Sequence, residues 1–131
     1  MKQMSAIIQK LKIGLVAALI FVGGCREEES VAGHTYVTEM EGLPITLAFD
    51  THEERYYGKA VNRYFGTYRM AGNRIFLRYP SSTMWGGDSD DMATEEIYFT
   101  ALTRVESFKL DHGELVLMQT GGGRIIFRQT N

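Results

Sequence analysis

Residues 64–79 read YFGTYRMAGNRIFLRY, and this stretch decides the fold class because large apolar residues alternate with polar ones. In an extended chain every second side chain lies on the same face, which here holds Tyr64, Gly66, Tyr68 and Met70. Gly72-Asn73 is a two-residue hairpin signal, and a second apolar run follows at residues 75–79. The stretch therefore predicts an antiparallel β-hairpin.

Similar short runs continue the pattern on both sides of this hairpin. They are Thr35–Thr38, Ile45–Phe49, Arg55–Ala60, Glu106–Leu110, Leu115–Met118 and Arg124–Arg128. Turn residues separate them at the spacing of an all-β sandwich or barrel. Strands and helices do not alternate, which excludes a parallel nucleotide-binding sheet. The chain of 131 residues suits one small domain.

One segment has a helical period instead. Tyr98, Ala101, Leu102 and Val105 are spaced as the apolar stripe of an amphipathic helix, which we expect over about Asp91–Thr103. Ser89, Asp90 and Asp91 are its N-cap candidates, and Glu95 and Glu96 suit its first turns. The sequence thus predicts a mainly β fold with one helix before the last two or three strands.

The N-terminus differs from the rest of the chain. Lys2, Lys10 and Lys12 precede the apolar run Ile13–Val22, which is too short to span a bilayer but fits a secretory signal. Gly23 and Gly24 then precede Cys25, the single cysteine. A buried helix ending in an inert thiol is the alternative, but the charged block Arg26–Glu29 that follows disfavours it.

The segment around Cys25 resembles the lipobox of bacterial lipoproteins. We therefore expect residues 1–24 to be a signal peptide, residues 25–31 a lipidated N-terminus with an acidic tether, and residues 32–129 a β-barrel domain. Cys25 would then be acylated and would anchor the chain in a membrane of the bacterial cell envelope. Arg26, rather than Asp, in the second position favours the outer membrane, on its periplasmic face or at the cell surface. Arg26–Glu29 also resembles a surface-export tag of Bacteroidota lipoproteins.

Removal of the signal changes the charge of the chain. The count of Lys and Arg falls from 14 to 11 while all 16 Asp and Glu remain, so the formal net charge becomes −5. An acidic domain lacks the clustered cations that nucleic acid binding needs. Because the domain is acidic, we also expect anionic lipid headgroups to repel it, with residues 26–30 acting as a solvated tether.

The sequence offers little for catalysis or metal binding. A calcium loop beginning at Asp88 would need Gly and Glu where Ala93 and Phe99 stand, so helix capping explains these acids better. Gly121–Gly123 precedes a strand-like run and suits a hairpin better than a phosphate cradle. The three histidines, which are His34, His52 and His112, lack partners at ligand spacing. We expect no catalytic residue, no metal site and no cofactor.

The loop Met84-Trp85-Gly86-Gly87 holds the only tryptophan. One interpretation, which we favour for Trp85, is that it closes one end of the core beneath the helix. The other is that it contacts a partner, since large aromatic residues are enriched at binding hot spots. Met84, Trp85, Tyr64 and Tyr68 are accordingly the candidate contact residues.

Several motifs together resemble the META/HslJ-like domain family. Gly58–Tyr68 (GKAVNRYFGTY) looks like its Gly…Asn-x-aromatic-x-Gly-x-Tyr signature, Ser82–Trp85 like its Thr-Met stretch, and Glu95–Leu102 like its helix motif. Residues 110–117 and 123–127 are similar to its terminal hairpin. The resemblance covers about Val31 to Gln129. It departs at Val61 and at Gly86 or Gly87, where many members carry cysteines.

This resemblance implies an antiparallel, partly open, lipocalin-like β-barrel in an envelope lipoprotein without an assigned activity. Gly58 and Gly66 would then lie at strand bends, Asn62 would bond neighbouring backbone, and Tyr64 and Tyr68 would point inward.

We expect a non-enzymatic, lipid-anchored and monomeric envelope protein that binds another protein or supports envelope stress tolerance. The alternative is a small barrel that carries a hydrophobic ligand or lipid. Its interior would be lined by Ile45, Leu47, Phe49, Tyr64, Tyr68, Ile75, Leu77, Leu115 and Leu117, which are bulky enough to fill it. A hydrolase that uses His52 or His112 is the third alternative.

Overall fold

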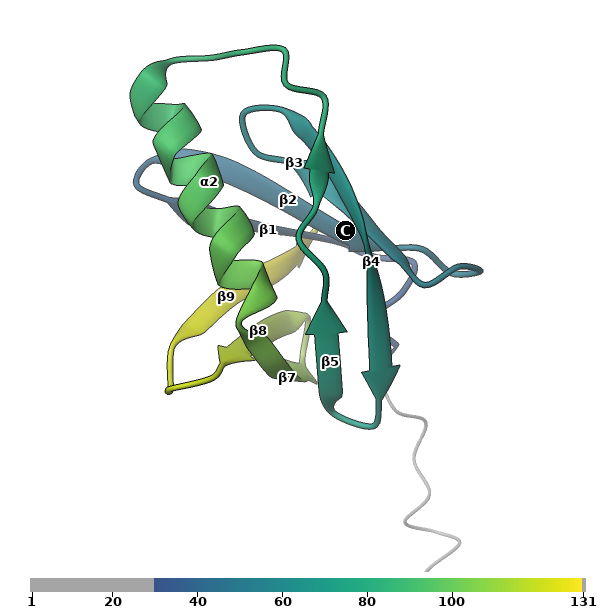
Figure 1. Ribbon diagram of the computed structural model, residues 1–131. Helices are drawn as coiled ribbons and strands as arrows, with labels where there is room; N and C mark the ends of the chain where they lie inside the picture. Colours follow the sequence, from purple (N-terminus) through teal and green to yellow (C-terminus); the bar gives the residue numbers. More distant parts are fainter. Residues whose placement is uncertain (1–29, 131) are drawn as a thin grey trace, which may run out of the picture.

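The structure is a computed structural model that describes residues 30–130, and Cys25 and the signal segment lie outside the described residues. In this part of the chain a highly curved antiparallel sheet surrounds one core, and a long helix, α2, packs on it (Figure 1). The elements are β1 Thr35–Met40, β2 Leu43–Phe49, β3 Arg55–Lys59, β4 Arg63–Ala71, β5 Arg74–Leu77, β6 Ser81–Ser82, α2 Ser89–Thr103, β7 Val105–Asp111, β8 Glu114–Gln119 and β9 Arg124–Thr130. All these strands and the whole described core lie within residues 31–130, so this segment has the anatomy of an independent domain.

The sheet closes on itself. Neighbouring strands follow the order β3-β2-β1-β9-β8-β7-β5-β4, and β4 pairs again with β3, while β6 adds a short pairing to β4. The fold class that the sequence predicts is confirmed, but the barrel is closed rather than partly open. Its weakest seam lies between β5 and β7, where a single residue pair, Arg74 and Ser107, is in register. The backbone N–H of Phe108 donates to the carbonyl of Asn73 at 2.9 Å, which completes the seam.

The hairpin that sets the fold is present as expected. Tyr68 pairs with Leu77 and Ala71 with Arg74, and Gly72 turns the chain with a positive φ of 60°. The second strand ends at Leu77 rather than Tyr79. The chain then forms β6, which the sequence did not predict because two serines carry no apolar alternation.

The barrel interior is occupied by side chains. Eight of the nine residues expected to point inward are buried, and they are Ile45, Leu47, Phe49, Tyr64, Ile75, Leu77, Leu115 and Leu117. Tyr68 is half-buried, with its ring 5.1 Å from that of Phe49. The predicted filling of the barrel is therefore confirmed for these residues.

Two glycines of the signature make room for tyrosine rings. Gly58 pairs with Tyr64, and Gly66 with Tyr56, across strands β3 and β4. A Cβ atom on Gly66 would lie 2.6 Å from the Tyr56 ring, and one on Gly58 would lie 2.0 Å from the carbonyl oxygen of Thr46. The reason for glycine is thus close packing on the inner face rather than a strand bend alone.

Helix α2 packs its apolar side into the barrel. Tyr98, Phe99 and Leu102 are buried, and the Tyr98 ring contacts Tyr64 of β4 and Phe127 of β9. The helix begins two residues earlier than expected, with Asp88 as its N-cap instead of Ser89, Asp90 or Asp91. Val105, which we assigned to the helical stripe, is buried in β7. Within residues 30–130 no helix has both the length and the apolar character that crossing a membrane requires.

Candidate binding surfaces

The four candidate contact residues fall into different environments. Trp85 is 89% exposed and Met84 77% exposed, so the interpretation that Trp85 closes the core is wrong. Tyr64 is only 1% exposed and lies inside the barrel, where a protein partner could not touch it. Tyr68 is half-buried and lines an open groove. The structure thus leaves Met84 and Trp85 together on one loop and separates them from the tyrosines.

Asn62 holds this exposed loop in place. The backbone N–H of Trp85 donates to Asn62 Oδ1 at 2.8 Å. The backbone N–H of Asn62 donates to Glu95 Oε2 at 2.8 Å, and its side-chain Nδ2 donates to Glu95 Oε1 at 3.3 Å. Because Glu95 lies on α2 and is only 4% exposed, these bonds tie the β3–β4 turn, the loop and the helix together. We refer to this set as the Asn62–Glu95 tie.

The loop backbone itself has special conformations. Met84 has a positive φ of 54°, which is uncommon for a residue other than glycine, and Gly86 has a φ of 103°. A Cβ atom on Gly87 would lie 2.3 Å from Cγ1 of Val61, so this end of the loop packs tightly. The exposed Trp85 ring therefore extends from a loop that is fixed at both ends.

The buried tyrosines form a structural network. The Tyr64 hydroxyl donates to the Thr46 carbonyl and lies 2.6 Å from the Tyr98 hydroxyl, while the Tyr56 hydroxyl donates to the Arg78 carbonyl. Burial raises the pKa of Tyr56, Tyr64 and Tyr98, which keeps all three phenols protonated near neutral pH. Their hydroxyls join strands and helix to one another, and we assign them no part in chemistry.

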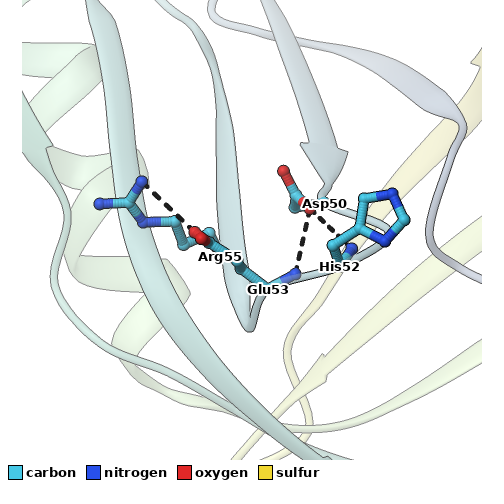
Figure 2. A network of polar contacts seen from close by, with 4 residues as sticks. All are labelled: Asp50, His52, Glu53 and Arg55. Atoms are coloured by element: carbon cyan, nitrogen blue, oxygen red, sulfur yellow. Dashed lines mark hydrogen bonds and ion pairs between the residues drawn. The ribbon is translucent and has the colours of Figure 1, made fainter.

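The three histidines lie in three separate hydrogen-bonding environments. His34 Nδ1 lies 3.0 Å from Gln129 Nε2, and His112 Nδ1 lies 2.6 Å from the Asp111 carboxylate on an exposed turn. His52 belongs to the β2–β3 turn, where the Asp50 carboxylate accepts its backbone N–H at 2.7 Å and that of Glu53 at 3.1 Å (Figure 2). These two bonds lower the pKa of Asp50, and the arrangement is a turn cap.

Metal ligands do not gather in the part of the chain that the structure describes. Within residues 30–130, no three side chains of His, Cys, Asp or Glu are placed as a metal ion would need.

The surface charges are separated along the chain, which the net charge conceals. Residues 55–78 contain six Lys or Arg and no Asp or Glu, whereas residues 30–54 contain five acids and no Lys or Arg. The six cations are exposed on strands β3, β4 and β5 or directly after them, and they are Arg55, Lys59, Arg63, Arg69, Arg74 and Arg78. We call this surface the basic face. Sequence reasoning missed it by averaging charge over the chain.

Exposed aromatic residues lie among these cations. Tyr57 and Phe65 pair with each other across β3 and β4 and are 48% and 50% exposed, and Phe76, paired with Arg69, is 57% exposed. A groove of about 630 Å³ is lined by Glu54, Thr67, Tyr68, Arg69, Phe76 and Arg78. A second groove of about 550 Å³ lies at the β5–β7 seam and shares Arg69 and Phe76. The basic face is therefore both charged and aromatic.

The described residues form a small closed barrel with a filled interior and with aromatic residues exposed on its outer surface. The chain belongs to the META domain family, whose model matches residues 27–131. The family resemblance of the sequence motifs is thereby confirmed. Among curated proteins, none matches this sequence.

Solved structures share the fold at low sequence identity. A protein from Burkholderia xenovorans, solved by NMR, superposes with a TM-score of 0.64 at 16% identity, over 82% of this chain and 97% of its own. A DUF4847 family protein from Bacteroides vulgatus gives a TM-score of 0.50 at 18% identity, over 66% of this chain and 59% of its own. These likenesses support the fold alone.

Proposed function

We propose that this META domain protein is a non-enzymatic, lipid-anchored protein of the bacterial cell envelope that binds a protein partner through the Met84–Trp85 loop. The observation that carries the proposal is the position of Trp85, which is 89% exposed on a loop fixed by the Asn62–Glu95 tie. A large aromatic side chain held rigidly in solvent loses little conformational freedom on binding, and such residues dominate interface energies.

The filled interior of the barrel supports a function that uses its outer surface. Twelve large side chains are less than 2% exposed, including Phe49, Tyr98 and Phe127. A ligand carrier of this size needs an interior that side chains leave free. The alternative of a hydrophobic-ligand barrel is therefore less well supported than the binding loop.

The envelope location rests on the sequence around Cys25. The proposed acyl chains would hold the mature domain at a membrane, most simply the outer membrane, and the partner would be another envelope protein. Each buried methylene contributes about 0.8 kcal/mol, so two or three chains anchor a domain durably. A role in envelope stress tolerance would follow if the partner belongs to that response. The intact mass of the protein extracted from membranes tests this part, because signal removal and acylation both change it.

Site-specific photo-crosslinking tests the binding loop. We would place a photoreactive amino acid at position 85 of the full chain in its native cells, and at position 97 as the control. Ile97 is also an exposed apolar residue, at 61%, but lies on the outer side of α2. We expect a discrete crosslinked protein from position 85 and none, or a weaker one, from position 97. Equal crosslinking at both positions, or none at position 85, would count against the loop.

A further inference from the structure

We propose that the basic face binds the anionic, phosphate-bearing headgroups of the membrane that holds the tether. The inference rests on the proposed anchoring of Cys25 for its choice of membrane, while the charge and geometry of the face are independent of it.

The first argument is the arrangement of charge. Arg69 pairs with Phe76, so the exposed Arg74 and Arg78, two residues either side of Phe76, are its diagonal neighbours. Lys59 and Arg63 pair at the Asn62 end of the face, and we assign them no part in membrane binding. Within residues 30–130, the only ion pair of a cation on this face is that of Arg55 with Glu53, at 3.6 Å between exposed groups. A stable barrel gains nothing from such a concentration of unpaired cations. An external anion would neutralise it.

The second argument is where the chain enters the domain. The Tyr36 hydroxyl donates to the carbonyl of Val31 at 2.8 Å, and the Tyr36 ring contacts Phe49, which contacts Tyr68. Tyr68 lines the groove with Arg69 and Arg78. The first residues of the domain therefore lie at the same end of the barrel as this part of the basic face.

The third argument is the length of the tether. Five residues lead from Cys25 to Ser30, and an extended chain covers at most about 3.6 Å per residue, or about 18 Å. A domain on so short a tether cannot move away from the bilayer surface. Arg55 of β3 pairs with Thr67, and Arg78, directly after β5, donates its backbone N–H to the Thr67 carbonyl, so both would then lie within reach of headgroup phosphates.

The fourth argument is the presence of aromatic side chains among the cations. Phe76 and Tyr57 are about half exposed, and aromatic rings favour the interfacial region of a bilayer. Juxtamembrane cations near an anionic surface attract it, while Glu54 in the same groove opposes that attraction, so Arg69, Arg74 and Arg78, on or directly after β4 and β5, carry the proposed binding. With these arginines at the bilayer, Trp85 lies away from it. It is bonded to Asn62, and the six residues from Arg63 to Arg69 span about 20 Å of β4.

Vesicle binding tests the proposal without the lipid anchor. A soluble form of residues 26–131, which retains all the strands and the core, is sedimented with phosphatidylcholine vesicles that contain about one third phosphatidylglycerol, and with pure phosphatidylcholine vesicles. We expect binding only to the anionic vesicles, and its loss at high salt. The double variant Arg69→Gln/Arg78→Gln should bind about thirtyfold more weakly, as expected for two cations at an anionic surface.

The matched control removes the same charge from another side of the barrel. Arg124→Gln/Arg128→Gln changes two exposed arginines of β9 and should leave binding within about twofold. Equal losses in both double variants would overturn the proposal, since only net charge would then matter. Binding to an oligonucleotide that exceeds binding to the vesicles, with the same dependence on Arg69 and Arg78, would overturn it in favour of nucleic acid.

The acidic tether is the remaining competitor for the face. If Glu27, Glu28 and Glu29 cover it, the soluble form will not bind anionic vesicles until these residues are changed to Gln, and the membrane proposal is then wrong.

The orientation of the domain is measured separately with brominated lipids, which quench the fluorescence of nearby tryptophan. Trp85 should stay unquenched, whereas Phe76→Trp in a Trp85→Phe background should be quenched. If the intact mass shows no acyl chain on Cys25 while vesicle binding is unchanged, the anchor is refuted and the proposal for the basic face is not.

Discussion

The Asn62–Glu95 tie offers the sharpest test of how the fold presents its loop. Replacing Asn62 with Ala removes the amide that donates to Glu95 Oε1 at 3.3 Å and accepts the Trp85 N–H at 2.8 Å. A hydrogen bond to a charged group contributes about 1.5–3 kcal/mol and a neutral one about 1 kcal/mol. We therefore expect the free energy of unfolding to fall by about 2–4 kcal/mol.

Replacing Glu95 with Ala removes the side chain that α2 contributes to the Asn62–Glu95 tie. It leaves the backbone N–H of Asn62 without its acceptor, and the side-chain Nδ2 with only the weak acceptor Met92 Sδ at 3.4 Å, at a site that is only 3% exposed. Each unsatisfied buried donor costs about 1–3 kcal/mol, so we expect a loss of about 2–5 kcal/mol. The neighbouring Glu96 is exposed, and Glu96→Ala should change stability by less than about 0.5 kcal/mol.

Urea unfolding followed by far-ultraviolet circular dichroism measures these effects. Trp85 fluorescence is unsuitable as the probe, because its side chain is already exposed in the folded state. In the double variant the two losses should not add, and the shortfall should be about 1–3 kcal/mol because both changes break one network. Additive losses, or single losses as small as that of Glu96→Ala, would refute the reasoning. Asn62→Ala should also weaken crosslinking at position 85 although Trp85 itself is unchanged.

Four further outcomes follow from the structure. Gly58→Ala places a Cβ atom 2.0 Å from the Thr46 carbonyl oxygen and should cost more than about 4 kcal/mol, whereas Gly72→Ala, with nothing within 4 Å but a positive φ, should cost about 1–2 kcal/mol in the same urea assay. Tyr64→Phe should cost about 1–3 kcal/mol, because the Tyr98 hydroxyl and the Thr46 carbonyl lose a partner; a melting temperature equal to that of the unchanged protein would contradict this. Because burial raises the pKa of the three buried tyrosines above 10.0, the unfolded chain loses these protons first, so stability should be level below about pH 10 and fall above it. In a Tyr57→Phe/Tyr68→Phe/Tyr79→Phe background, which keeps only the buried tyrosines, tyrosinate absorbance that rises before the loss of circular dichroism would show that the buried phenols ionise in the folded barrel. Trp85 emission should be solvent-like and readily quenched by acrylamide, and a blue-shifted, protected emission would contradict the exposed loop.

The strands could be predicted from sequence because inward and outward positions alternate over most of their length. In β2 a large apolar residue occupies every second position, at Ile45, Leu47 and Phe49. That alternation alone places these three side chains on one face of the strand. The two-serine strand β6 has no such signal, and only its pairing with Tyr64 and Phe65 of β4 defines it. Closure of the barrel was equally hidden, since it depends on the register of one residue pair at the β5–β7 seam.

The candidate sites were predicted less well, for physical reasons that differ between residues. Trp85 reads as a core residue by size, and its exposure follows from hydrogen bonds between segments 23 residues apart in sequence. Tyr64 was placed correctly inside the barrel but belongs to the core rather than to a contact surface. The basic face was visible in the sequence as residues 55–78 without an acid, yet only strand pairing shows that its cations share one surface.

The central claim is that a filled barrel acts through its outer surface, and native mass spectrometry of the protein extracted gently from membranes tests it most directly. The account predicts a folded chain that carries only covalent mass at Cys25, with or without a protein partner that dissociates when Trp85 is replaced. A small apolar molecule that copurifies with the barrel, survives the change at Trp85 and is released only when the chain unfolds would contradict it.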